Sequence, residues 1–488
     1  MSPDTLPANR PLPWPPSRHD PALTRLIPRA LAVRLKIFPL AHDPAQACLK
    51  LAAAHPEDLR LGEQLRRQLP SIRCFHWQAA VAEEIEQVIE QHYGYGEEID
   101  RLLARLTEAD RTRRRVDGPE ARQLLDAFIA DAVRLAASDI HFEPEAGFTR
   151  VRYRIDGWLR AIHRLPPSVW QALLVCLKLR AGLDIADSRS PQDGRFSADL
   201  AGRSVDFRVA SLPTLHGENL VIRILDRQRS LLTIDALGLD DDSLGQLARI
   251  HRKPEGLLVV TGPTGSGKTT TLYSLLMAAS HPGVNVMTLE DPVEHPLPLI
   301  RQTPVCEAVR LDFAHGIRSL LRQDPDIVMI GEIRDADSAA MAFRAAMTGH
   351  QVYTTLHANS ALAALPRLLD LGLSPLTLAG SLNGIIAQRL LRRLCPACRS
   401  QHEDGHWQAS GCADCDWQGY RGRQAVMEIV RITPALADLI AAGASPERLR
   451  EAATAAGYIP LAERAKALAI QGQTSLSEVR RVIDLEEA

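Results

Sequence analysis

The stretch Gly262-Pro263-Thr264-Gly265-Ser266-Gly267-Lys268-Thr269 decides the fold of this chain. It fits the phosphate-loop pattern G-x-x-x-x-G-K-S/T, and it stands between the apolar run 257–260 and a helix-prone segment that begins at Thr271. Glycines let such a loop turn its backbone N–H groups toward phosphates, and the following helix adds the positive end of its dipole. Lys268 is expected to reach the terminal phosphates, and the Thr269 hydroxyl to ligate Mg²⁺. The residues predicted to bind ATP are Gly262, Pro263, Thr264, Gly265, Ser266, Gly267, Lys268, Thr269 and Thr270.

Four apolar segments separated by helical patterns include the strand that leads into this loop. They are residues 257–261, 284–289, 327–330 and 351–356. Strands that alternate with helices in this way predict an α/β domain with a parallel sheet. Ligands bind at the carboxyl ends of such strands, so we expect the polar residues after each strand to line one site.

Acidic residues follow the second and third of these strands. Asp291 and Glu294 can ligate Mg²⁺, through water, or position an attacking water. The third strand ends as a Walker B strand does, except that Gly331 stands where the metal-binding Asp is usual. Glu332 is then the candidate that orients the nucleophilic water. The Mg²⁺ ion is expected to depend more on Thr269 and on the carboxylates near Asp291 and Glu294.

Two histidines, His350 and His357, bracket the fourth strand. A single histidine in a folded domain is usually a hydrogen-bonded structural residue. Two of them beside one nucleotide-binding sheet leave a second interpretation open, in which they sense the γ-phosphate or order water.

Four of the eight cysteines form two C-x-x-C pairs separated by thirteen residues. This spacing is close to that of structural zinc sites, in which four sulfurs close a tetrahedron and leave no open position for catalysis. Four unligated cysteines are a weaker interpretation, because the loop between the pairs is polar and offers them no core. The predicted zinc ligands are Cys395, Cys398, Cys412 and Cys415. We expect the others, Cys48, Cys74, Cys176 and Cys306, to be separate buried side chains.

Length and charge limit the remaining possibilities. A chain of 488 residues is too long for one core, and two to four domains are expected. Its 57 Lys and Arg against 59 Asp and Glu give a formal charge of −2, so no overall basic field favours nucleic acid as a partner. No apolar run of eighteen residues and no secretory signal is visible, so we expect a cytosolic protein that touches a membrane only through partners.

Composition and patterning divide the chain into five segments. The predicted segments are a disordered Pro-rich leader (1–21), a small α/β domain (22–96), an exposed charged linker (97–117), an α+β domain (118–231), and the nucleotide-binding domain (232–488), which carries the tetracysteine module at 395–423 and C-terminal helices.

Several separate motifs in one order give the chain a family resemblance. They are ASDIH at 137–141, the acidic box at 288–295, the Walker B block at 321–335, the histidine box at 348–359, and the tetracysteine module followed by GYRGR at 419–423. Together they resemble the ATPases that power type II secretion and type IV pilus assembly, the GspE/PilB family, and within it the type II secretion branch. The resemblance extends from about residue 22 to the end. It implies a RecA-like ATPase domain preceded by a PAS-like domain.

The resemblance also implies a role for the second domain. It implies a hexameric ring in which arginines of the PAS-like domain neutralise charge on the transferring γ-phosphate. The matching positions here are Arg208 and Arg223. Side chains alternate between the two faces of a strand, which by itself places both arginines on a solvated face of the sheet. Only the resemblance favours a role for them at the γ-phosphate.

Partners follow from the same resemblance. It implies a homohexamer, cytoplasmic and peripheral at the inner membrane, that acts on platform proteins: a bitopic recruiter of the GspL type and a polytopic protein of the GspF type. Residues 22–96 resemble the region that docks on the recruiter. Some relatives have longer N-terminal modules that bind cyclic di-GMP; the preceding repeat of such a module is not visible here, and we predict no such binding.

The expected function is an ATP-hydrolysing motor that couples hydrolysis to pseudopilus assembly and to protein export across the outer membrane. A type IV pilus assembly ATPase is the alternative, and the compact N-terminal region favours secretion. The N-terminal domain and the cysteine module weigh against a retraction motor, and balanced charge weighs against a nucleic-acid translocase. A scaffold that binds ATP without turnover has only Gly331 in its support.

Overall fold

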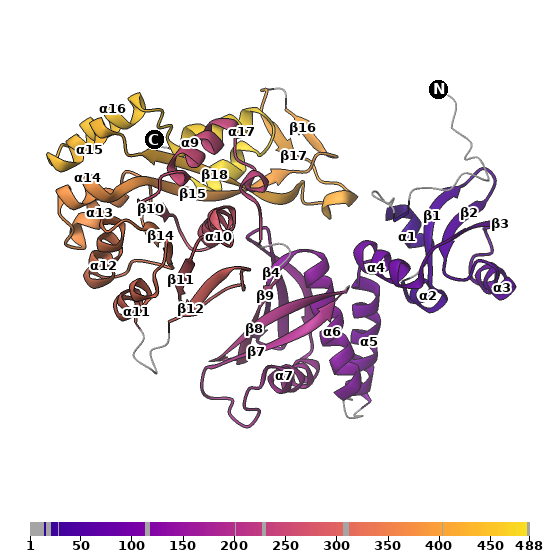
Figure 1. Ribbon diagram of the computed structural model, residues 1–488. Helices are drawn as coiled ribbons and strands as arrows, with labels where there is room; N and C mark the ends of the chain where they lie inside the picture. The colour runs from indigo at the N-terminus through magenta and orange to yellow at the C-terminus, as the bar shows by residue number, and fades with distance from the viewer. Residues whose placement is uncertain are drawn as a thin grey trace. The chain divides into compact units, whose positions relative to one another are not determined.

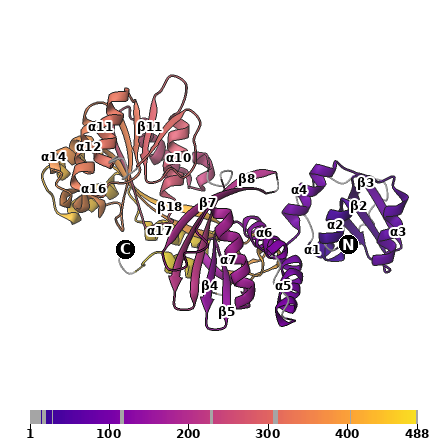
Figure 2. The same ribbon diagram turned by 90° about the horizontal axis from the view of Figure 1, so that it is seen from below.

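The computed structural model describes residues 14–15, 21–27, 29–112, 118–200, 202–226, 231–305, 312–402 and 404–485. The chain forms two compact units, residues 1–226 and 227–488 (Figures 1 and 2). Most of the predicted leader lies outside the described residues, as do residues 113–117 of the predicted linker and Cys306. No described helix is both long enough and apolar enough to cross a bilayer.

A three-stranded sheet with helices forms the beginning of the first unit. Its elements are α1 (Pro21–Leu26), α2 (Arg29–Leu35), β1 (Ile37–Asp43), β2 (Cys48–Ala53), α3 (Leu59–Gln68), β3 (Cys74–Ala79) and α4 (Ala82–His92). β2 pairs antiparallel with β1 and parallel with β3, and α3 lies in the crossover between the parallel strands. Phe38, Leu51 and Ile85 are fully buried in the core of this part.

Two cysteines expected to be separate are paired here. Cys48 lies opposite Cys74 in the register of β2 and β3, and the two form a disulfide. The expectation of isolated buried thiols is therefore wrong for this pair, because neighbouring strands bring together residues that are 26 positions apart. Cys176 is a free thiol and is partly buried.

The charged stretch expected to be an exposed linker is mostly helical. α5 (Gly96–Arg111) buries Ile99, Leu102 and Leu106 and packs with α6 (Gly118–Arg134). The prediction of a linker is wrong for these residues because the spacing i, i+3, i+7 of the three apolar side chains makes one face of a helix. The many charged residues around them occupy its solvent face.

An antiparallel sheet of six strands forms the rest of the first unit. Its strands are β4 (Ala137–Glu145), β5 (Phe148–Ile155), β6 (Trp158–Leu165), β7 (Gln192–Leu200), β8 (Arg203–Thr214) and β9 (Gly217–Leu225), in the order β6-β5-β4-β9-β8-β7. The helices α6 and α7 (Pro167–Ala181) share a core with it. Val205, Phe207 and Val209 alternate into this core, so Arg208 between them lies on the opposite face. This α+β domain confirms the predicted fold class.

A seven-stranded sheet organises the second unit. Its strands are β10 (Gly256–Thr261), β11 (Val286–Glu290), β12 (Ile300–Pro304), β13 (Ile327–Ile330), β14 (Gln351–Leu356), β15 (Leu382–Leu394) and β18 (Tyr420–Arg431), in the order β12-β11-β13-β14-β10-β15-β18. The pairs are parallel except for the antiparallel pair of β15 and β18. The parallel sheet confirms the prediction, and β10, which leads into the phosphate loop, lies between β14 and β15.

Helices cover this sheet, and apolar side chains from them and from the strands form its cores. They are α9 (Asp241–His251), α10 (Lys268–Ala279), α11 (Phe313–Leu320), α12 (Ala336–Met347), α13 (Ala364–Asp370), α14 (Pro375–Ser381), α15 (Pro434–Ala441), α16 (Pro446–Ala455), α17 (Leu461–Ile470) and α18 (Leu476–Val482). Between β15 and β18 the chain forms a small hairpin of β16 (Arg399–Gln401) and β17 (Trp407–Ala409). The two C-x-x-C pairs flank this hairpin.

Candidate active site and tetracysteine centre

The phosphate loop joins the end of β10 to the start of α10. Gly262, Gly265 and Gly267 have φ angles of 144°, 78° and 88°, which other residues adopt only with strain. Lys268 is the first residue of α10, and its Nζ donates to the carbonyl oxygens of Gly262 at 2.7 Å and Pro263 at 3.2 Å. Burial lowers the pKa of Lys268, and the charge of Glu332 opposes that shift. The lysine therefore faces the loop it is predicted to serve.

Glu332 lies in a cluster of charged groups at the carboxyl edge of the sheet. Arg334 forms an ion pair with Glu332, and its Nη2 also lies 3.3 Å from Oδ2 of Asp291. Nε2 of His357, which follows β14, lies 3.7 Å from Oε2 of Glu332. The structure thus brings together three predicted site residues, and it adds Arg334, which the sequence analysis did not select.

A buried network anchors the acidic box behind this cluster. Glu290 is 3% exposed and accepts hydrogen bonds from Tyr273 of α10, from Thr288 at 2.5 Å and from Gln302 at 3.0 Å. The backbone N–H of Glu294 donates to the Tyr273 hydroxyl at 3.3 Å. Burial and the charge of Glu290 raise the pKa of Tyr273, so this hydroxyl keeps its proton. The helix that begins at Lys268 is thereby joined to the segment that carries Asp291 and Glu294.

His350 is not brought to this edge of the sheet. It precedes β14, and its carbonyl accepts from Gly256 at the start of β10, whereas the phosphate loop follows the end of β10. A six-residue strand spans roughly 20 Å, which separates His350 from the loop within this unit. Its Nδ1 lies 3.0 Å from the carbonyl oxygen of Ala345, which favours the structural interpretation that the sequence left open.

Arg208 and Arg223 lie in the first unit, in register on adjacent strands. Arg195 of β7 lies opposite Arg208, Arg208 opposite Arg223, and Arg223 opposite Asp139. Nε of Arg223 donates to Oδ1 of Asp139 at 3.1 Å. The three arginines line a surface cavity of about 490 Å³ together with Asp193. Like charges directly opposite one another are unfavourable, so this row is suited to an anion.

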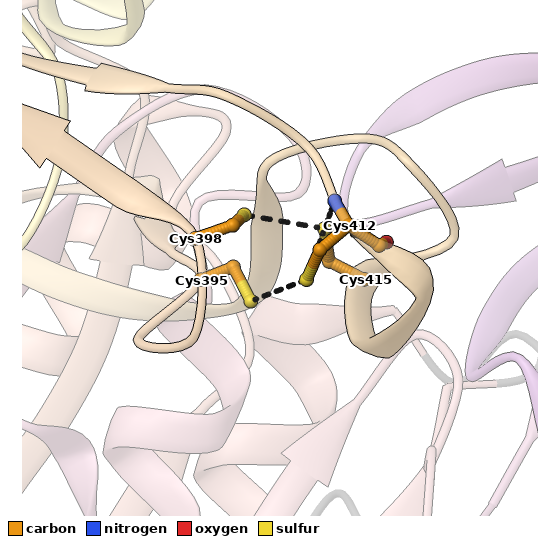
Figure 3. Close-up of side chains that lie close together, drawn as sticks. All are labelled: Cys395, Cys398, Cys412 and Cys415. Carbon is orange, nitrogen blue, oxygen red and sulfur yellow. Dashed lines mark hydrogen bonds between the residues drawn. The ribbon is translucent and has the colours of Figure 1, made fainter. Parts of the chain in front are cut away.

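The four predicted zinc ligands converge, as Figure 3 shows. The Sγ–Sγ distances are 3.9 Å for Cys395 and Cys412, 3.7 Å for Cys398 and Cys415, and 3.8 Å for Cys412 and Cys415. Zinc–sulfur bonds of about 2.3 Å in a tetrahedron place sulfur atoms roughly 3.8 Å apart, so the cluster fits a Zn²⁺ ion. Burial opposes ionisation of Cys415, but hydrogen bonds from the backbone N–H groups of Cys412 and Gly419 lower its pKa to about 7. That environment favours a thiolate ligand.

Sequence reasoning missed two residues of β15 beside the phosphate loop, Gln388 and Arg389. Nη2 of Arg389 donates to the carbonyl of Asn359 at 3.0 Å, and a Cβ at Gly262 would lie 3.3 Å from Nη1 of the same arginine. The string Gln388-Arg389 carries no motif by itself. Only the sheet order, which places β15 next to β10, could have indicated it.

Comparisons with known proteins agree with this geometry. The family model described as Type II/IV secretion system protein matches residues 115–481, and the MshEN domain model matches residues 12–99. The Type II secretion system protein HxcR of Pseudomonas aeruginosa is 44% identical over 385 residues, 79% of this chain and 82% of its own length. The type IV pilus assembly ATPase PilB of Myxococcus xanthus is 36% identical over 494 residues, 94% of this chain and 86% of its own length.

A solved structure is similar over the same region. The crystal structure of the pilus retraction motor PilT with bound ADP has a TM-score of 0.54 and 27% identity, and the match covers 75% of this chain and 98% of that chain. The resemblance inferred from the motifs is confirmed, because one family model covers well over half of the sequence. This chain belongs to the Type II/IV secretion system protein family.

Proposed function

We propose that this chain is the ATP-hydrolysing motor of a type II secretion system, in which hydrolysis drives pseudopilus assembly and protein export across the outer membrane. The observation that carries the proposal is the cluster of Glu332, Asp291 and His357 at the same sheet edge as the phosphate loop. Relatives named for type II secretion, at 44% identity, support the choice of machine. The family membership itself makes the chain an ATPase.

Each group in the site has a definite task in this proposal. ATP would draw Nζ of Lys268 away from the carbonyls of Gly262 and Pro263 and onto the terminal phosphates. The carboxylate of Glu332 would orient the attacking water, and Arg334 holds that carboxylate in place. His357, 3.7 Å from the same carboxylate, is suited to sense the γ-phosphate or to order water. His350 takes no part in this proposal.

The site also offers oxygen ligands for Mg²⁺. Thr269 is exposed in the first turn of α10, and the side chain of Asp291 is 41% exposed at the facing strand end. Together with Glu294 they are the hard oxygen donors that Mg²⁺ prefers. Bound there, the ion would neutralise phosphate charge during transfer.

Arg208 and Arg223 are proposed to supply positive charge to the γ-phosphate from the first unit. The support is the register of the arginine row and its suitability for an anion. If these arginines act on the ATP bound by a neighbouring chain, the active motor must contain more than one chain. We propose a homohexamer, cytoplasmic and peripheral at the inner membrane, that acts on platform proteins of the GspL and GspF types.

The tetracysteine centre is proposed to hold one structural Zn²⁺. Its sulfur spacing supports this, and four protein ligands leave no position for a reacting water.

The N-terminal domain, which matches the MshEN model, is proposed to dock on the membrane recruiter. That it does not bind cyclic di-GMP stays a prediction.

A type IV pilus assembly ATPase is the second candidate. The relative from Myxococcus xanthus supports it, because that match extends over 94% of this chain. Both candidates need the same chemistry and differ in the machine that the motor drives.

Replacing Lys268 by Ala on the chromosome separates them. We expect secreted enzymes to accumulate in the periplasm, measured as their distribution between periplasm and medium, with Lys253→Ala as a control variant. Unchanged secretion together with loss of surface filaments would favour the pilus candidate. If neither secretion nor filaments change, both candidates are wrong.

A further inference from the structure

Gln388 makes a buried contact with the phosphate loop that the proposed mechanism does not use. It lies on β15, is 1% exposed, and its side-chain amide lies between two parts of the nucleotide site. Nε2 donates to the carbonyl oxygen of Ser266 at 2.8 Å, and Oε1 accepts from the Thr271 hydroxyl at 2.7 Å. One side chain thus connects the loop to the helix that follows it.

The carbonyl of Ser266 fixes which way the amide of Gln388 faces. A carbonyl oxygen can only accept, so Nε2 must face it, and Oε1 is left to accept from the Thr271 hydroxyl. The close approach is also built into the loop. A Cβ at Gly267 would lie 2.7 Å from Nε2 of Gln388, and a Cβ at Gly262 would lie 2.6 Å from the Gln388 carbonyl oxygen. Both glycines therefore leave room for Gln388.

The orientation of one peptide unit follows from this contact. The carbonyl of Ser266 and the N–H of Gly267 belong to the same trans peptide, so they point in opposite directions. When Gln388 holds the carbonyl on the β15 side, the N–H of Gly267 points away from β15 into the loop. Phosphate loops bind their ligand through such N–H groups.

We propose that Gln388 is a positioning residue for the nucleotide: its fixed amide sets the Ser266–Gly267 peptide so that the loop presents its N–H groups to the phosphates before ATP arrives. The proposal rests on the ATPase function above and deepens it. Gln388 itself touches no reacting atom, and its effect passes through the loop.

The isosteric variant Gln388→Glu tests the proposal, because it removes the donor and sets a carboxylate against the Ser266 carbonyl. In the full-length protein, we expect the Kd for Mg·ADP and the KM for ATP to rise at least tenfold, with kcat at saturating ATP within about threefold of wild type, because Glu332 is untouched. Thr271→Val, which removes only the hydroxyl that donates to Oε1, should raise Kd about threefold. It also carries the test if Gln388→Glu does not fold.

Asn383 supplies a matched control on the same strand. Its Nδ2 donates to the carbonyl of Glu255 at 2.7 Å, and a Cβ at Gly256 would lie 2.6 Å from that nitrogen, so the same kind of contact exists at the amino end of β15. Asn383→Asp should lower the melting temperature as Gln388→Glu does and leave the Kd for Mg·ADP within twofold. Equal losses of ADP affinity in the two variants, or normal affinity in Gln388→Glu, overturn the proposal. A wild-type protein that bound ADP but failed to hydrolyse ATP would contradict the proposed function instead.

Discussion

The nucleotide site and the tetracysteine centre lie along one strand, β15, yet they are completed in different ways. The cysteines come from residues 395–415, and their sulfurs already stand at the spacing of a zinc tetrahedron. The nucleotide site draws on the ends of several strands, and Lys268 is turned back onto the carbonyls of its own loop. In the tetracysteine centre, which comes from one short segment, local folding alone brings the ligand atoms to their binding geometry. In the nucleotide site, which comes from several strands, Lys268 must still move from the loop carbonyls to the phosphates when ATP binds.

Lys268→Ala should impair the nucleotide site and leave the tetracysteine centre intact. We expect ATP turnover to fall about a thousandfold, or ~4 kcal/mol of transition-state free energy, because the cation at the terminal phosphates is lost. Phosphate release measures turnover, and elemental analysis should still find about one zinc per chain. Lys253→Ala, at the other edge of the sheet, should change neither, and turnover within tenfold of wild type in Lys268→Ala would contradict the assignment.

Glu332→Gln should separate binding from chemistry within the distributed site. The amide cannot orient water as the carboxylate does, so kcat should fall roughly a hundredfold while the Kd for Mg·ADP stays within about threefold. Calorimetric titration and phosphate release give the two quantities. Glu255→Gln, an exposed control at the amino end of β10, should change neither kcat nor this Kd. Normal turnover in Glu332→Gln would contradict the role proposed for Glu332.

Arg208→Ala and Arg223→Ala test how far the distributed site extends. Each should lower kcat roughly tenfold to a hundredfold without loss of ADP affinity, because the charge is needed where the γ-phosphate is transferred. Arg150 lies on β5 of the same sheet and pairs with Glu145 rather than with Asp139, so Arg150→Ala is the matched control. An equal loss in the control would indicate a general effect on the sheet.

Zinc removal should have the smallest effect on nucleotide chemistry. If the centre holds zinc as proposed, Cys395→Ser is expected to lose the metal and to lower the melting temperature by several degrees, because metal binding to such a site contributes to folding. The Kd for Mg·ADP should stay within about threefold, and Cys176→Ser should keep its zinc. A parallel loss of zinc and of ADP affinity would show that β15 couples the two sites and that the tetracysteine centre is not independent of the nucleotide site.

The sequence predicted most accurately the features that depend on residues close to one another in the chain. The phosphate loop, the four central strands and the two C-x-x-C pairs are each local patterns, and the structure contains all of them. Helix α5 lies in a stretch whose many charges favour a linker, whereas the spacing of Ile99, Leu102 and Leu106 favours one face of a helix. The apolar spacing is the more reliable of the two signals here.

Other features could not be read from the chain because they depend on which strands are neighbours. Cys48 meets Cys74, and Arg195 joins the arginine row, only through strand register. His350 looked equivalent to His357 until the direction of β14 placed it at the far edge of the sheet. Gln388 belongs to this group too, since its contact with Ser266 requires β15 to lie beside β10.

The continuity of β15 restricts where this chain can change its length. From Gln388 the strand runs through Arg392, whose Nη2 lies 2.7 Å from Oε2 of the buried Glu478, to its end at Leu394, and Cys395 follows. Side chains alternate along a strand, so one inserted residue within 388–395 would turn either the amide or the arginine to the wrong face and displace the cysteine. Insertions and deletions should therefore be tolerated in the turn that joins β16 to β17, which lies outside their paired residues, and rejected in the strand that leads to the hairpin.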